Sequence, residues 1–97
     1  MKKNTGKILD IITSKEDHMR LHKTIQNKTR RKILEFLMEK ERTIEELFKL
    51  TGLTQKELDY HIKMLKYGLC IEEFERENKI YYRPTREGEI VIELTKK

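Results

Sequence analysis

Apolar side chains recur along most of this chain at spacings of three and four residues, which is the period of an amphipathic helix. The pattern predicts four helices, over residues 14–25, over residues 27–40, over two turns that begin at residue 43, and over residues 54–68. After them, residues 69–75 and 79–83 are rich in β-branched and aromatic side chains, which favour strands. The fold is therefore expected to be mainly α with a small β-hairpin.

Two T-x-x-E motifs predict the starts of consecutive helices: Thr43 precedes Glu46, and Thr54 precedes Glu57. In such a capping box the hydroxyl accepts from the N–H three residues on, and the glutamate accepts from the N–H of the cap. Gly52, between the two motifs, can take the positive φ that ends the first helix without a Cβ penalty. Two short helices joined in this way form a helix-turn-helix.

The second helix of this motif has two different faces. Leu58, Ile62 and Leu65 fall on one stripe, and they need a core to pack on. The outward side then carries Gln55, Lys56, Asp59, Tyr60, Lys63 and Tyr67. Lysines can neutralise phosphates, and a glutamine can bond to an adenine edge. An ordinary solvated helix face is the alternative interpretation.

Basic residues crowd the start of the helix predicted over residues 27–40, for which Asn27 is the expected N-cap. These residues are Lys28, Arg30, Arg31 and Lys32. Positive charge at a helix N-terminus is unfavourable to the helix, and a phosphate held there would compensate it. Charges that are merely solvated are the alternative. The buried stripe of this helix is predicted to be Ile33, Leu34, Leu37 and Met38.

The predicted hairpin turns at residues 76–79, where Asn78 tolerates a left-handed conformation. Pro84 ends its second strand because proline cannot donate to a ladder. Thr85 then caps a last segment for which we favour a helix, although Ile90, Ile92 and Leu94 alternate as in a strand.

Both ends of the chain are more apolar than free tails would be. Residues 8–12 fit a short amphipathic helix, and the last segment carries further aliphatic side chains. Such residues either cover the core or meet a second subunit. The candidates for an interface are Ile8, Leu9, Ile12, Ile90, Val91 and Leu94.

Composition limits the chain to one small domain and favours a polyanionic partner. It has 97 residues, 40% of them charged, and a net charge of +5. No apolar run approaches the about 18 residues of a membrane span, and no signal-peptide core is present, so we expect a cytoplasmic protein. Cys70, the only cysteine, excludes an internal disulfide and is expected to be a small core residue.

Catalytic and metal-binding patterns are weak. His18 and His22 lie one helical turn apart, which can chelate a metal, but two imidazoles make only half a tetrahedral site. We therefore expect no metal, no cofactor and no identifiable small-molecule ligand. The chain shows no Gly-rich phosphate loop, no nucleophile with a credible base and no paired carboxylates, so we expect no enzyme.

Three segments together resemble the ArsR-type winged-helix transcriptional regulators. They are LHKTIQNKTRRKILEFL over residues 21–37, TIEELFKLTGLTQKELDYHIKMLKYGLC over residues 43–70, and ENKIYYRPTREG over residues 77–88. The resemblance implies a winged helix-turn-helix, with a three-helix core and a wing, over residues 20–84. Residues 1–19 would form an N-terminal extension and residues 85–97 a C-terminal segment, both helical and used for dimerisation.

The resemblance also implies a function. The protein would be a sequence-specific double-stranded-DNA-binding transcriptional regulator, a nucleoid-associated homodimer on a pseudo-palindromic operator. Gln55, Lys56, Asp59, Tyr60 and Lys63 would read bases and hold phosphates. The further DNA contacts implied or expected are Thr43, Thr54, Lys28, Arg30, Arg31, Arg76 and Lys79.

The chain departs from the family in two respects. The helix before the turn, EELFKL, lacks the cysteine pair of metal-sensing members, and the last segment has no histidine for the family's other sensor site. The first wing strand carries Glu72, Glu73 and Glu75, followed by Glu77, where basic residues would strengthen a DNA contact. A winged-helix module that binds proteins in a transcription or RNA-handling complex is the alternative function.

Overall fold

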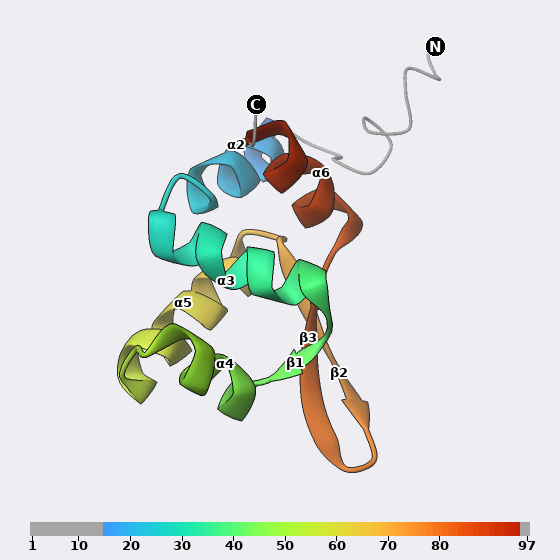
Figure 1. Ribbon diagram of the computed structural model, residues 1–97. Helices are drawn as coiled ribbons and strands as arrows, with labels where there is room; N and C mark the ends of the chain where they lie inside the picture. The colour runs from blue at the N-terminus through green and yellow to red at the C-terminus, as the bar shows by residue number, and fades with distance from the viewer. Residues whose placement is uncertain (1–14, 96–97) are drawn as a thin grey trace.

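The structure is a computed structural model that describes residues 15–95 (Figure 1). Its elements in chain order are α2 (Lys15–Thr24), α3 (Lys28–Glu39), β1 (Arg42–Thr43), α4 (Ile44–Thr51), α5 (Gln55–Tyr67), β2 (Ile71–Arg76), β3 (Lys79–Pro84) and α6 (Arg86–Thr95). The three-helix core and the hairpin predicted from the sequence are confirmed. The segment 8–12 and residue 14, where the first of the four predicted helices was expected to begin, lie outside the described residues. No helix within 15–95 is long and apolar enough to span a membrane.

The core forms where the apolar stripes of α3, α4 and α5 meet. The predicted residues Ile33, Leu34 and Leu37 of α3 are buried, and so are Leu58, Ile62 and Leu65 of α5, with Leu47 of α4 between them. Met38 was expected in the same stripe, but it lies half-buried at the edge of this core. The helical period of the sequence therefore selected the inward faces correctly.

The helix starts follow the predicted capping chemistry. Asn27 accepts from the N–H of Arg30 at 3.0 Å. Both T-x-x-E motifs form complete capping boxes, at the starts of α4 and α5. Gly52 ends α4 with a φ of 71°, the left-handed conformation for which glycine was expected there.

The wing belongs to a three-stranded antiparallel sheet with the order β1-β3-β2. Phe74 pairs with Tyr81 across the hairpin, and the two turn residues, Glu77 and Asn78, both have positive φ. β1 was not predicted. It has two residues, too few to show an alternation, and it exists only because Arg42 and Thr43 pair with Tyr82 and Tyr81 of β3.

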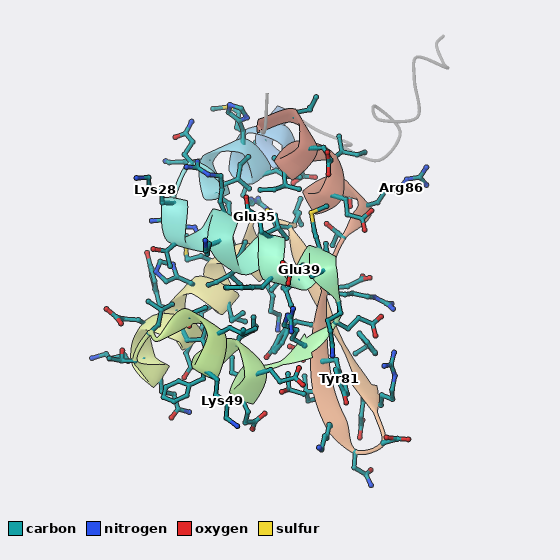
Figure 2. The ribbon with its side chains drawn as sticks, viewed as in Figure 1. Lys28, Glu35, Glu39, Lys49, Tyr81 and Arg86 are labelled. Carbon is teal, nitrogen blue, oxygen red and sulfur yellow. The ribbon has the colours of Figure 1, made fainter. Side chains whose placement is uncertain are left out.

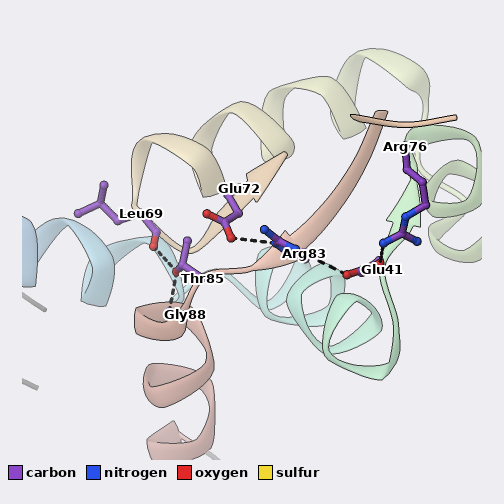
Figure 3. A network of polar contacts seen from close by, with 7 residues as sticks. All are labelled: Glu41, Leu69, Glu72, Arg76, Arg83, Thr85 and Gly88. Carbon is purple, nitrogen blue, oxygen red and sulfur yellow. Dashed lines mark hydrogen bonds and ion pairs between the residues drawn. The ribbon is translucent and has the colours of Figure 1, made fainter. Parts of the chain in front are cut away.

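The last segment is a helix, as favoured, because tertiary burial follows a helical period there. Val91 and Ile92 are buried while Leu94 is 65% exposed, a pattern that a strand would not give. Thr85 fixes its start, since the Thr85 hydroxyl donates to the carbonyl of Leu69 at 2.6 Å and accepts from the N–H of Gly88 at 2.9 Å (Figure 3). α6 packs beside α2 and α3 at the end of the molecule opposite the wing tip (Figure 1).

Gly68 is needed for close approach and not for an unusual φ. The left-handed residue that follows α5 is Leu69, with a φ of 66°. A Cβ on Gly68 would instead overlap the hydroxyl of Thr24, which is buried at the end of α2. The end of α5 is thereby held directly against the end of α2.

We expect Gly68→Ala to destabilise the protein more than Gly52→Ala does. The first substitution forces an overlap in the core, which costs about 3 kcal/mol. The second places a side chain in a left-handed conformation with open space around it, which costs about 1 kcal/mol. Equilibrium unfolding in urea measures both free energies. Equal losses for the two variants would contradict the tight contact between Gly68 and Thr24.

Candidate nucleic-acid interface

The structure gathers the predicted recognition residues on one exposed face of α5. Gln55, Lys56, Asp59, Tyr60 and Lys63 are all exposed, and the buried stripe of the same helix lies opposite them. Because that stripe is fixed in the core, the polar face cannot turn inward. The result is a rigid helical surface that presents amide, ammonium, carboxylate and phenol groups together.

The capping box at Thr54 holds the first turn of this surface in place. The carboxylate of Glu57 accepts from the N–H of Thr54 at 3.0 Å, and the N–H of Glu57 donates to the Thr54 hydroxyl at 3.1 Å. The backbone bond to Thr54 is the main reason that the pKa of Glu57 lies below its usual value. Glu57 is thus turned back on the helix start, next to the exposed side chains of Gln55 and Lys56.

Arg30 joins α3 to α5 in a way that the sequence did not reveal. Its Nε donates to the carbonyl of Thr24 at 2.9 Å, and its Nη1 lies 3.3 Å from Nδ1 of His61. The pKa of His61 is lowered, mainly because the ring is partly buried and secondly because the positive charge of Arg30 lies beside it. A guanidinium is only a donor, so this contact requires a neutral His61 that accepts at Nδ1.

The basic start of α3 is compensated within the chain, in part, by the end of α2. Nη1 of Arg31 donates to the carbonyls of Ile25 at 2.9 Å and Gln26 at 3.3 Å, beside the bond from Arg30 to Thr24. The carbonyls at the end of a helix carry partial negative charge, which suits a guanidinium. The expected phosphate is therefore not needed to explain these two arginines, whereas Lys28 stands exposed at the helix start (Figure 2).

The wing arginines are also engaged with protein groups. Arg76 bonds to Glu41 at 2.7 Å, and Arg83 bonds to Glu72 at 2.9 Å (Figure 3). Both guanidinium groups lie over the ring of Phe74, at 5.0 Å and 4.4 Å. These ion pairs and cation–π contacts hold Arg76 against the side of the hairpin, whereas Lys79 is exposed beside the turn.

The acidic strand β2 is partly neutralised by the rest of the chain. Glu72 pairs with Arg83, and Glu73 pairs with Lys66 of α5 at 2.7 Å. The second pair ties the wing to the last turn of α5. Glu75 and Glu77 remain exposed near the hairpin turn.

The candidate dimer residues have different environments. Leu94 is 65% exposed and Ile90 is half-buried, but Val91 is buried in the core of its own chain. The other candidates, Ile8, Leu9 and Ile12, lie outside the described residues.

The remaining candidate groups are Cys70 and the histidines of α2. Cys70 is fully buried in the core, as predicted, and this burial raises the pKa of its thiol to about 12. The side chain of His18 is not described. Among the described residues, His22 included, no group of three or more His, Cys, Asp or Glu side chains could hold a metal ion.

Comparison with known proteins shows which family this chain resembles over part of its length. Residues 27–67 match the model of the bacterial regulatory proteins of the arsR family. That family is one of transcriptional regulators and not a class of enzymes. No match was found among proteins with curated functions.

Several solved structures share the fold. A homodimeric winged helix-turn-helix DNA-binding domain from Mycobacterium bovis, a possible ArsR-family transcriptional regulator, is 25% identical with a TM-score of 0.70, over 96% of this chain and 82% of that one. HlyU from Vibrio cholerae is 25% identical with a TM-score of 0.72, over 82% and 88%. The transcriptional repressor PagR of Bacillus anthracis is 23% identical with a TM-score of 0.72, over 82% and 93%. The predicted winged helix and its resemblance to ArsR-type regulators are thus confirmed.

The contact between Arg30 and His61 predicts a dependence of stability on pH. Because the pKa of folded His61 lies below its ordinary value of 6.5, the unfolded chain binds more protons between these two values. The contribution of His61 is complete above about pH 6.5 and is lost as the pH falls toward the folded pKa. We expect His61→Gln to flatten this part of the curve of unfolding free energy against pH.

The matched control is His22→Gln, which leaves the contact between Arg30 and His61 in place. Urea unfolding at a series of pH values between about 5 and 7.5 covers the range in which histidine titrates. If His61→Gln and the parent protein lose stability in parallel as the pH falls, the assigned contact is wrong.

Proposed function

We propose that this ArsR-type winged-helix protein is a sequence-specific double-stranded-DNA-binding transcriptional regulator that acts as a homodimer on a pseudo-palindromic operator. The observation that carries the proposal is the exposed face of α5, on which Gln55, Lys56, Asp59, Tyr60 and Lys63 lie together within a winged helix of this family type. A protein of this kind would reside on the nucleoid in the cytoplasm.

In the proposed complex α5 enters the major groove with its N-terminal end toward the bases. Gln55 lies in the first turn, where an amide can bond to N6 and N7 of adenine. Asp59, one turn further on, can accept from the N4 amine of cytosine. Lys56 and Lys63 would neutralise phosphates, and Tyr60 would add a hydrogen bond or an apolar contact at the edge.

The starts of α4 and α5 and the wing would position the protein on the backbone. Thr54 is exposed at its helix start, whereas Thr43 is buried, so Thr54 is the better placed of the two for a phosphate. Lys28 and Lys79 are exposed and would add further phosphate contacts. Arg30, Arg31 and Arg76 are held by protein groups, and we assign them the role of positioning these elements.

The exposed carboxylates near the hairpin turn, Glu75 and Glu77, disfavour insertion of the wing deep into a minor groove. We propose that the wing lies along the backbone, with Lys79 as its cation. The same acidic turn is the feature that would favour a protein partner if the chain does not bind DNA.

The end of the molecule formed by α2 and α6 would make the dimer. The Mycobacterium bovis domain with this fold is homodimeric. Here α2 and α6 lie together, away from α4 (Figure 1), and they expose Met19 and Leu94. With both helices at one end, two copies could present their α5 helices to successive major grooves about 34 Å apart.

The deciding experiment is selection from a pool of random DNA duplexes at about 50 mM and 200 mM salt, followed by sequencing of the bound fraction. An enriched motif with two-fold symmetry and a steep dependence of affinity on salt would support the proposal. Binding without any enriched sequence would contradict the proposed specificity. Absence of binding at the lower salt would turn the search to a protein partner.

Substitutions on α5 should separate affinity from specificity. We expect Lys63→Ala to weaken binding to all duplexes and to reduce the salt slope by about one per subunit. Gln55→Ala should instead relax the preference at one position of each half-site, by about 1–3 kcal/mol, and leave the salt slope unchanged. Fluorescence titration of the selected site and of single-base variants measures both effects.

The matched control for the charge is Arg86→Ala, which removes one cation far from Lys49 and the helix-turn-helix (Figure 2). It should bind DNA like the parent protein. If Lys63→Ala and Gln55→Ala both bind like the parent, the recognition face has been assigned to the wrong side of the protein.

Leu94→Glu should weaken the dimer because it introduces a charge into an apolar contact. We expect the dissociation constant of the dimer to rise by on the order of tenfold or more. Sedimentation equilibrium measures it directly. Leu50→Glu, which changes a similarly exposed leucine on α4, is the control and should leave the dimer intact. A dimer unaffected by Leu94→Glu would place the interface elsewhere.

A further inference from the structure

We propose that the hollow between α4 and the start of α5 receives the C5-methyl group of a thymine, so that the base step next to the one read by Gln55 is selected for thymine. This inference rests on the proposed function and names a specificity determinant within it. The side chains that would contact the methyl group are Ile44 and Phe48 of α4.

The hollow lies on the surface between α4 and the start of α5 and has a volume of about 310 Å³. Its lining comes from one side of α4 and from the first turn of α5: Ile44, Glu45, Phe48, Lys49, Gln55 and Leu58. Leu58 forms part of the core and closes the hollow from within. The side chains that remain accessible in its walls are therefore largely apolar, and its rim is charged.

The position of the hollow connects it with base reading. Ile44 and Gln55 also line a second hollow, of about 320 Å³, that continues along α5 past Asp59 and Lys63. Gln55 therefore lies between the two hollows, and Ile44 is the apolar side chain that lines both of them. A base contacted by Gln55 would place its neighbour in the stack opposite Ile44 or Phe48.

Phe48 is the largest apolar group at this place, and its side chain is 47% exposed. A single exposed hydrophobic residue is common and needs no function by itself. Phe48 is informative because it lies on the wall of a concave site that shares Gln55 with the recognition face. Leu50, 43% exposed on the same helix, lies outside that wall and provides a comparison.

Thymine is the base that matches such a wall. Among the base edges of the major groove, only thymine presents a methyl group, while cytosine has a hydrogen there and the purines present polar atoms. Removal of a methyl group from water into an apolar contact is favourable by about 0.8 kcal/mol, or about fourfold in Kd. A cytosine at the same step would lack this apolar contact.

The charged rim indicates how the duplex would lie. Lys49 and Glu45 stand on the same rim, so a phosphate is favoured beside the lysine and disfavoured beside the carboxylate. A backbone that passes on the lysine side leaves the apolar wall to the base edges. The hollow is thus suited to the methyl group of a base and unsuited to a phosphate.

The experiment uses the full chain and the duplex selected from the random pool, with each thymine replaced in turn by deoxyuridine. This replacement removes one methyl group and leaves the hydrogen bonds of the base pair unchanged. We expect one position per half-site to show a loss of about fourfold in affinity, and a loss of about 15-fold when both half-sites are changed.

Variants of the wall should remove this discrimination. Phe48→Ala, and independently Ile44→Val, should bind the thymine and deoxyuridine duplexes with closer affinities, at an unchanged salt slope. Leu50→Ala is the control and should discriminate as the parent protein does. A thermal unfolding curve for each variant confirms that it is folded at the temperature of the titration.

Two results would overturn the inference while leaving the proposed function intact. One is a selected operator in which no thymine can be replaced by deoxyuridine with a loss of affinity. The other is a sensitive thymine whose discrimination survives in both Phe48→Ala and Ile44→Val. Failure of the pool to yield any enriched sequence is a different outcome, because it contradicts the proposed function itself.

Discussion

The burial of one stripe of α5 sets the orientation of the exposed polar face that is proposed to read DNA. Leu58, Ile62 and Leu65 are buried against α3 and α4, and each side chain contributes about 1.5–3 kcal/mol when it is fully removed from water. Rotation of α5 by half a turn would expose all three and would bury Lys56 and Lys63. The polar face therefore points outward because the opposite face cannot leave the core.

A second constraint connects this helix to the far end of the molecule. The carbonyl of Thr24, the last residue of α2, accepts from Arg30, and the carbonyl of Ile25, which follows it, accepts from Arg31. Arg30 also contacts His61 of α5, and Gly68, directly after α5, lies on Thr24. α2 in turn packs against α6. Of the two helices proposed to form the dimer, α2 is thus in direct contact with the helix proposed to read DNA, and α6 packs on α2. The spacing of two α5 helices would therefore be fixed by packing and not by a linker.

The charged side chains of the wing can be interpreted only when their partners in the protein are known. The four glutamates in and after β2 suggest a surface that would repel DNA. However, Glu72 is paired with Arg83, and Glu73 is paired with Lys66. Conversely, Arg76 looks like a phosphate contact in the sequence and is held by Glu41 and the ring of Phe74. Exposed ion pairs of this kind contribute little to stability. Their main effect is to decide which charges remain available to a ligand.

The sequence by itself determined the elements that local physics controls. Helical period, the capping boxes at Thr43 and Thr54, the left-handed Gly52 and the turn at Asn78 all depend on neighbouring residues, and all were predicted correctly. The outward face of α5 followed from the same period. Tertiary structure alone decided four other features. They are the two-residue strand β1, the contact of Arg30 with His61, the close approach of Gly68 to Thr24 and the hollow beside Gln55. Each joins residues far apart in the chain, and no local pattern encodes the distance at which such residues meet.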